Sequence, residues 1–258
     1  MNTIFALAQV VIKELYRRKD FYVLFILTVL ITLLMASASI FHDDKIVRYL
    51  KDICLLLIWI SALVMAVGTA ARQIPAEREN RTIFPLLAKP VSRAQVIAGK
   101  FLGCWLASGM ALVVFYLFLG LVCASREHEW HVFIYLQALW LQWVFLAVII
   151  ALVLFGSVIF AAPSSNATIS IVVVISIWFL GSHLNTVALQ QAEPMRSIIY
   201  TIYFLIPHLE WYDIRDLVVH NRPLVSGTIC GLATLYGAAY TGVFLFATWL
   251  CFRRKPLN

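Results

Sequence analysis

The chain has 258 residues, of which 62% are hydrophobic and only 13% are charged. Its mean hydropathy is +0.90, whereas about a quarter of the residues of a soluble domain carry a charge. These values exclude a soluble globular domain and predict an all-α membrane protein with one transmembrane domain over residues 1–258. The net charge of +7 comes from short segments beside apolar stretches, so it predicts no nucleic-acid-binding surface.

Residues 3–19 are predicted to form an amphipathic helix ahead of the first membrane span. Ile4, Leu7 and Val11 recur at helical spacing, whereas Lys13 lies on the other side. Such a helix lies in the membrane interface with its cations near lipid headgroups. The alternative is a plain cytoplasmic extension of the first span.

Six segments are apolar enough to cross a bilayer, which takes about 20 residues of helix. The spans are predicted at about 21–41, 53–71, 99–123, 133–161, 167–189 and 225–251. The fourth and fifth are separated at Pro163, because the uncharged stretch there is too long for one crossing. Ala36-Ser37-Ala38 has the small residues of a signal-peptide cleavage site, but the apolar run continues to Phe41, which favours a retained span.

Lysine and arginine placement predicts the orientation of these spans. Thirteen of the 20 Lys and Arg residues fall in segments on the same side as the amino terminus. Cytoplasmic loops carry the excess of these residues. Both termini and the segment between the second and third spans are therefore expected in the cytoplasm.

The segment at 191–223, between the last two spans, is expected on the outer side. Residues 198–206 are strongly apolar and are followed by Pro207. Nine residues are too few to cross a bilayer as a helix, so we expect a re-entrant or interfacial helix here. A polar helix should follow, with Trp211 and Tyr212 as interface anchors.

The predicted spans lack the residues of an enzyme or an ion-coupled carrier. No Asp, Glu, Lys or Arg lies in a span core, and His183, accompanied by Asn185, is the only histidine near a span interior. The five cysteines show no paired spacing, which argues against a disulfide framework or a zinc site. We therefore expect no catalytic residue, cofactor or metal, and any active transport must draw its energy from outside the membrane.

Charge is concentrated between the second and third spans, at residues 72–98. Glu77, Arg78, Glu79 and Arg81 fall within one and a half helical turns, and prolines divide the segment into short pieces. Short helices carrying both signs of charge would suit a docking surface for another protein. A solvated loop explains the charge content equally well.

A resemblance to a known family favours the docking surface. The segment and the start of the third span resemble the signature of ABC-2 type transporter permeases, with Arg81 at a position where many members have glycine. The matching residues are Ile74, Glu77, Glu79, Thr82-Ile83, Leu86-Leu87, Pro90-Val91-Ser92-Arg93, Gly99-Lys100 and Gly103.

The resemblance implies a permease subunit of an ABC exporter in the bacterial cytoplasmic (inner) membrane. It further implies two copies of a cytoplasmic ABC ATPase subunit, a second permease subunit in a homodimer, and contact with membrane lipids. Residues 72–98 would be the coupling segment, and the chain would be no enzyme itself because it lacks nucleotide-binding motifs. The implied ATPase contacts are Glu77, Arg78, Glu79, Arg81, Thr82, Pro90 and Arg93. The alternative is a membrane scaffold that docks a cytoplasmic partner without transport.

Overall fold

A computed structural model describes residues 2–17, 19–38, 44–79, 92–127 and 131–254. Within these ranges the chain forms helices and turns but no strand. The helices are α1 (Asn2–Arg17), α2 (Lys19–Ala38), α3 (Asp44–Ala70), α4 (Pro75–Glu79), α6 (Arg93–Glu127), α7 (Val132–Ile159), α8 (Pro163–Gln190), α9 (Met195–Leu205), the 3-10 helix η1 (Leu209–Tyr212), α10 (Arg215–Val219) and α11 (Gly227–Arg254). The all-α class predicted from composition is confirmed over this part of the chain.

Five segments of the described chain are long and apolar enough to cross a membrane. They are Arg48–Glu79, Arg93–Ser125, Val132–Ile159, Pro163–Gly181 and Gly227–Arg254. The expected first span corresponds to α2, in which the described apolar stretch, Tyr22–Leu34, is shorter than the other five and too short to cross a bilayer by itself. The multi-pass character is thus confirmed, whereas the sixth span stays a prediction.

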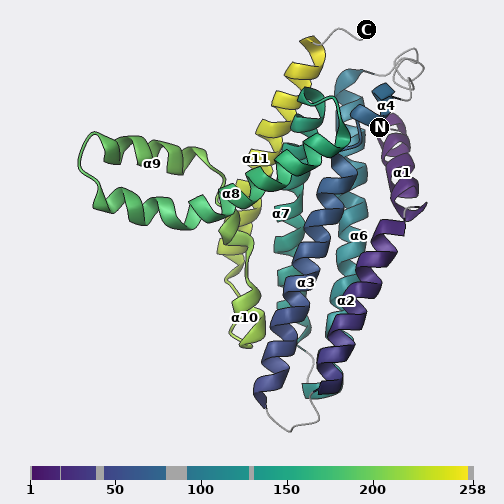
Figure 1. The fold of residues 1–258 in the computed structure, drawn as a ribbon, viewed down its shortest axis with the longest axis vertical. Coiled ribbons are helices and arrows are strands. Elements are labelled where there is room, and N and C mark those ends of the chain that lie inside the picture. Colours follow the sequence, from purple (N-terminus) through teal and green to yellow (C-terminus); the bar gives the residue numbers. More distant parts are fainter. Residues whose placement is uncertain (1, 18, 39–43, 80–91, 128–130, 255–258) are drawn as a thin grey trace.

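Helices α3, α6, α7 and α11 run along a common axis and form a bundle, with α2 alongside α3 and α6 (Figure 1). Helix α7 lies at its centre, since 72% of its most apolar window is buried. Small side chains on α3, such as Ala62 and Ala66, are fully buried. Close approach of small residues provides the packing contacts that hold helices together in lipid.

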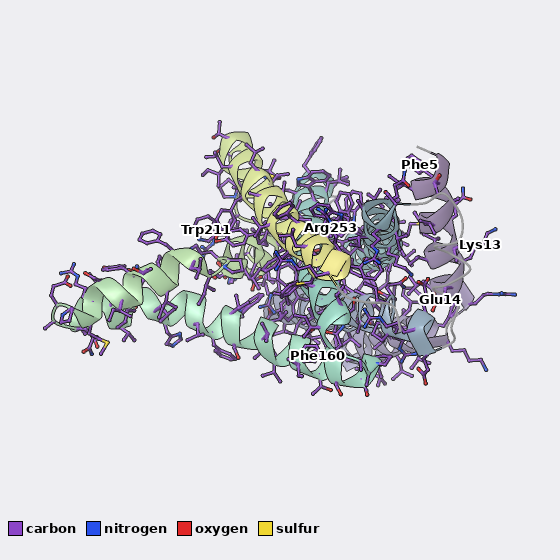
Figure 2. The ribbon with its side chains drawn as sticks, turned by 90° about the horizontal axis from the view of Figure 1, so that it is seen from above. Phe5, Lys13, Glu14, Phe160, Trp211 and Arg253 are labelled. Atoms are coloured by element: carbon purple, nitrogen blue, oxygen red, sulfur yellow. The ribbon has the colours of Figure 1, made fainter. Side chains whose placement is uncertain are left out.

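Helix α1 packs against the first half of α6 through two glycines. A Cβ atom at Gly99 would lie 2.7 Å from Cβ of Leu7, and one at Gly103 would lie 2.7 Å from Cβ of Val11. Glycine at both positions therefore lets the two backbones approach closely. Viewed down the bundle, α1 lies across its edge with Lys13 pointing outward (Figure 2). The amphipathic helix expected at 3–19 is present, and its place in the membrane interface stays a prediction.

The amino terminus, α4 and the carboxyl-terminal end of α11 lie at the same end of the bundle (Figure 1). This arrangement agrees with the predicted topology, in which these three parts share one side of the membrane. Helix α10 lies toward the opposite end, where the outer segment is expected.

Helices α8 and α9 depart from the expected arrangement. Helix α8 leaves the bundle at a steep angle and α9 turns back along it, so the two form an arm that projects sideways (Figure 1). Only 22% of the most apolar window of α8 is buried. The short apolar helix expected before Pro207 is present as α9, but it lies beside α8 and not at the outer end. A re-entrant course for residues 191–223 stays a prediction.

Candidate functional site

The candidate site is the coupling segment at the end of the bundle that holds both termini. The structure describes its two flanks, residues 72–79 with α4 and residues 92–98 at the start of α6. Three predicted site residues, Arg81, Thr82 and Pro90, lie outside the described residues.

Helix α3 ends because Pro75 has no backbone N–H to continue it. Residues 71–74 form a turn, and Pro75 then begins α4, where its missing N–H is tolerated. Within α4, the N–H of Arg78 donates to the carbonyl of Ile74 at 3.1 Å. The sequence thus builds a short helix directly on the end of a predicted span.

Lys100 of α6 fastens this short helix to the bundle. Its Nζ donates to the Gln73 carbonyl at 2.9 Å, to Gln73 Oε1 at 3.3 Å and to Glu77 Oε1 at 2.6 Å. Lys100 is only 4% exposed, and a buried ammonium is tolerated only when it is paired. We call Lys100, Gln73 and Glu77 the root clamp, because they join the root of α4 to α6.

Sequence reasoning missed the role of Lys100 in this clamp. Lys100 matched the family motif, and a lysine at the end of a span is ordinarily a cytoplasmic charge near the lipid headgroups. A usable signal was present, because Glu77 and Lys100 lie at the adjoining ends of two consecutive spans. The clamp turns Glu77 inward, so its charge is already paired within the subunit.

Arg78 and Glu79 lie further along α4. Glu79 is exposed. The Nη2 atom of Arg78 is buried and has no hydrogen-bond partner within the described part of the chain. Buried polar atoms in folded proteins nearly always have partners, so this Nη2 atom is an exception among the described residues.

The second flank starts with a capping box. Ser92 Oγ accepts from the N–H of Gln95 at 3.2 Å, and Gln95 Oε1 accepts from the N–H of Ser92 at 2.9 Å. The predicted third span at 99–123 is therefore preceded by helix from Arg93 onward.

Arg93 ties this flank to the end of α11. Its Nη1 donates to the carbonyls of Phe252 at 2.5 Å and Arg253 at 2.9 Å, and its guanidinium lies 5.4 Å from the centre of the Phe252 ring. A cation at the carboxyl end of a helix satisfies free carbonyls and complements the helix dipole. Arg93 thus has a bracing role inside the subunit, and its contact with an ATPase stays a prediction.

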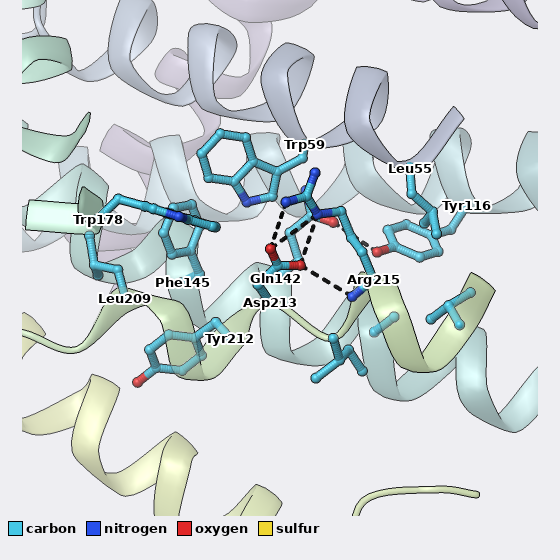
Figure 3. Close-up of a pocket in the computed structure, with 13 residues that line it drawn as sticks. Leu55, Trp59, Tyr116, Gln142, Phe145, Trp178, Leu209, Tyr212, Asp213 and Arg215 are labelled. Carbon is cyan, nitrogen blue, oxygen red and sulfur yellow. Dashed lines mark hydrogen bonds and ion pairs between the residues drawn. The ribbon is translucent and has the colours of Figure 1, made fainter. Parts of the chain in front are cut away.

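A second polar group lies deeper in the bundle, where the outer segment meets α3, α6 and α7 (Figure 3). Arg215 Nε donates to Asp213 Oδ1 at 2.8 Å and Nη2 donates to Oδ2 at 2.6 Å. The guanidinium lies 5.9 Å from the ring of Trp59, near the middle of α3. The hydrogen bonds that Arg215 donates to the Asp213 carboxylate raise the pKa of Arg215 above its ordinary value. The expectation of uncharged span cores did not anticipate this contact.

A small cavity adjoins the Asp213–Arg215 pair. Tyr116 donates to Gln142 Oε1 at 2.8 Å, while Gln142 Nε2 is buried without a partner among the described residues. The cavity has a volume of about 10 Å³ and is lined mainly by aromatic and aliphatic side chains. This is about the space that one water molecule needs.

The outer segment is held to the bundle by further hydrogen bonds. Lys51, fully buried, donates to Asn221 Oδ1 at 2.9 Å. Tyr212 donates to the carbonyl of Ala233 at 2.8 Å, and Gln137 Nε2 donates to the carbonyl of Val225, just before α11, at 2.8 Å. These contacts join residues far apart in the sequence, and none was predicted.

His183 and Asn185, the polar residues singled out near a span interior, are both exposed on α8. The Nδ1 atom of His183 lies 3.1 Å from the carbonyl of Phe179. Within the described ranges, no three His, Cys, Asp or Glu side chains gather as metal ligands would.

Comparison with known proteins gives the family. A search of curated proteins found no match. The family model described as ABC-2 family transporter protein matches residues 6–255, which is nearly the whole chain. The chain therefore belongs to the ABC-2 transporter family and is a multi-pass membrane component of an ABC transporter.

Proposed function

We propose that the chain is the permease subunit of an exporter, and that a separate cytoplasmic ATPase drives it through residues 72–98. The root clamp is the observation that carries this proposal. It joins α4 to α6 through a buried ammonium, while α4 also follows directly from α3. A force applied to α4 would therefore reach two spans at once.

The exposed side of α4 is where the ATPase would bind. Glu79 is exposed and Arg78 beside it is partly exposed, so both side chains could pair with opposite charges on a partner. Charged hydrogen bonds of this kind give orientation as well as affinity. Arg81, Thr82 and Pro90 would extend the same surface. The coupling segment and both termini would then lie in the cytoplasm, and the membrane would be the bacterial inner membrane.

The outer segment would close the exit. Its Asp213–Arg215 pair reaches Trp59 near the middle of α3, and its bond from Lys51 holds it to the far end of the same helix. Opening this path would require the segment to withdraw from α3. The substrate would then leave on the side opposite to the ATPase.

A second copy of the chain would complete the transporter, with one ATPase for each copy. The α8–α9 arm supports this part of the proposal, since it projects from the bundle with Phe179, Phe204 and Leu205 at 64%, 72% and 76% exposure. A partner subunit would bury these side chains, and membrane lipids would cover the remaining apolar surface.

The test is copurification followed by transport. The chain is expressed with a cytoplasmic ABC ATPase subunit from the same organism, and recovery of the ATPase is measured for wild type, Glu79→Lys and the control Glu193→Lys. Glu193 is an exposed acid at the α8–α9 turn, far from α4. We expect Glu79→Lys to lower recovery at least tenfold and to abolish export. Full recovery and export with Glu79→Lys would contradict the assignment of this surface.

A scaffold that only docks a partner predicts a different result. It would recruit the ATPase without any ATP-dependent movement of substrate in vesicles that contain both subunits. Stimulation of ATP hydrolysis by one member of a panel of lipids, drugs and polysaccharides would identify the substrate class. The absence of transport for the whole panel, together with normal recruitment, would favour the scaffold.

A further inference from the structure

Helix α8 begins beside the root of the coupling segment, and Asn166 in its first turn makes the connection. Asn166 is completely buried, with 0% of its surface exposed. Its Nδ2 donates to the carbonyl of Ala71 at 3.3 Å and to the carbonyl of Val153 at 3.2 Å. Its Oδ1 accepts from Ser170 Oγ at 3.2 Å. One amide thus joins the end of α3, the carboxyl-terminal part of α7 and the start of α8.

The Ala71 carbonyl needs a donor from outside its own helix. In an α-helix this carbonyl would accept from the N–H four residues later. That residue is Pro75, which has no N–H. The amide of Asn166 supplies the missing donor. The proline that separates α3 from α4 therefore also creates the acceptor that α8 uses.

The surrounding residues leave space for this amide. A Cβ atom at Gly156 of α7 would collide with Asn166 Oδ1. Ala71 and Val153 are themselves fully buried, so water could not reach their carbonyls if the Asn166 amide moved away. Unpaired polar groups in such a place are costly. The end of α3 and the start of α8 are therefore favoured to move together.

We infer that Asn166 is a positioning residue that passes displacement of the coupling segment to the α8–α9 arm. The inference rests on the proposed function. When an ATPase moves α4, the turn at 71–74 moves with it, and the Ala71 carbonyl pulls on the amide. Helix α8 then tilts about its first turn. Because the arm is long and its far part is largely exposed, a small rotation there gives a large displacement at its tip.

The experiment compares movement at α4 with movement at the arm. Labels are placed at Ala76 on α4 or at Gln191 at the tip of the arm, each paired with a label at Met110, which is 51% exposed on α6. The native cysteines are replaced, and the permease–ATPase complex is reconstituted in nanodiscs. Both label distances are measured by pulsed spin-label spectroscopy without nucleotide and with ATP trapped.

The variants are Asn166→Leu and its matched control Asn185→Leu, an exposed position on the same helix. We expect ATP to change both distances in wild type and in the control. In Asn166→Leu the change at Ala76 should persist, while the change at Gln191 should fall at least threefold. Substrate moved per ATP should fall at least tenfold, with ATP hydrolysis within twofold of wild type.

The outcomes separate this inference from the proposed function. Full movement at both labels in Asn166→Leu overturns the inference and leaves the proposed function standing. A wild-type complex in which ATP moves neither label overturns the proposed function and the inference with it. If Asn166→Leu fails to fold, Pro75→Ala provides the test, because it gives the Ala71 carbonyl a backbone donor that competes with the amide. Pro75→Ala should reduce the change at Gln191, and an undiminished change there overturns the inference.

Discussion

Removal of the Lys100 charge should loosen the root of the coupling segment without unfolding the bundle. Lys100→Met keeps most of the aliphatic side chain and removes the three hydrogen bonds to Gln73 and Glu77. Breaking a fully buried ion pair costs about 3–5 kcal/mol, and a hydrogen bond to a charged group contributes about 1.5–3 kcal/mol. The Glu77 side chain is 25% exposed, so water can solvate part of its charge once Lys100 is gone. The smaller of the two ranges therefore applies, and we expect the attachment of α4 to the bundle to lose about 2 kcal/mol of free energy.

This loss should appear as local opening of α4. Since 1.4 kcal/mol is a factor of ten, about 2 kcal/mol raises the population of the detached state about 30-fold. Hydrogen exchange measures that population at the amides of Ala76 and Arg78, which donate to Arg72 and Ile74 at 3.0 and 3.1 Å. Exchange at both amides should accelerate by about this factor in nanodiscs.

Lys13→Met is the matched control for this change. Lys13 is exposed and points away from the bundle, so the same substitution removes a charge without removing the clamp (Figure 2). Exchange at α4 should be unchanged in the control. If Lys100→Met also leaves exchange within about threefold of wild type, the clamp does not hold α4. Adding Glu77→Gln to Lys100→Met should recover part of the protection, because it removes the negative charge that Lys100 no longer balances.

Three further changes test other contacts. Arg93→Lys should destabilise the end of α11 by about 1 kcal/mol, because one ammonium cannot bind two carbonyls and stack on a ring as the guanidinium does. Hydrogen exchange in the last turn of α11 should become faster, and unchanged exchange there would contradict the bracing role. Gly103→Ala should lower the midpoint of thermal unfolding, since overpacking against α1 costs about 1–3 kcal/mol. The control Gly120→Ala adds its methyl group to open space and should raise the midpoint or leave it unchanged. Equal midpoints for the two variants would argue against the close contact between α1 and α6. Asp213→Asn should lower the free energy of unfolding by about 1–2 kcal/mol, because the partly exposed ion pair with Arg215 loses its negative charge. Denaturant unfolding measures this loss, and an unaltered midpoint would show that the ion pair does not stabilise the fold.

Much of the fold could be predicted because it depends on local sequence. The amphipathic spacing of residues 3–19 gave α1, and five of the expected spans coincide with long apolar helices. Pro75 and Pro207 marked helix ends that the structure contains. In each case the signal lies within about one helix length, so no knowledge of distant partners was needed.

The candidate site was predicted only in outline. The charged segment and its place beside the termini could be anticipated, but the inward turn of Glu77 could not. Charge density gives the composition of a surface, and it does not say which carboxylate faces the bundle. Arg93 shows the same limit, because its acceptors are carbonyls at the far end of the chain.

The linear sequence was enough to identify this protein as a helical membrane protein of the ABC-2 family. The hydropathy of a span is a property of one helix, and a family signature is read along the chain. Neither therefore depends on how the helices are rotated against one another. The packed helices were needed to show that Lys100 holds α4, that Asn166 supplies the donor missing at Pro75, and that α8 and α9 project as an arm. These contacts join residues from different helices, and they depend on tilt and rotation that apolar spans of nearly uniform hydrophobicity do not specify.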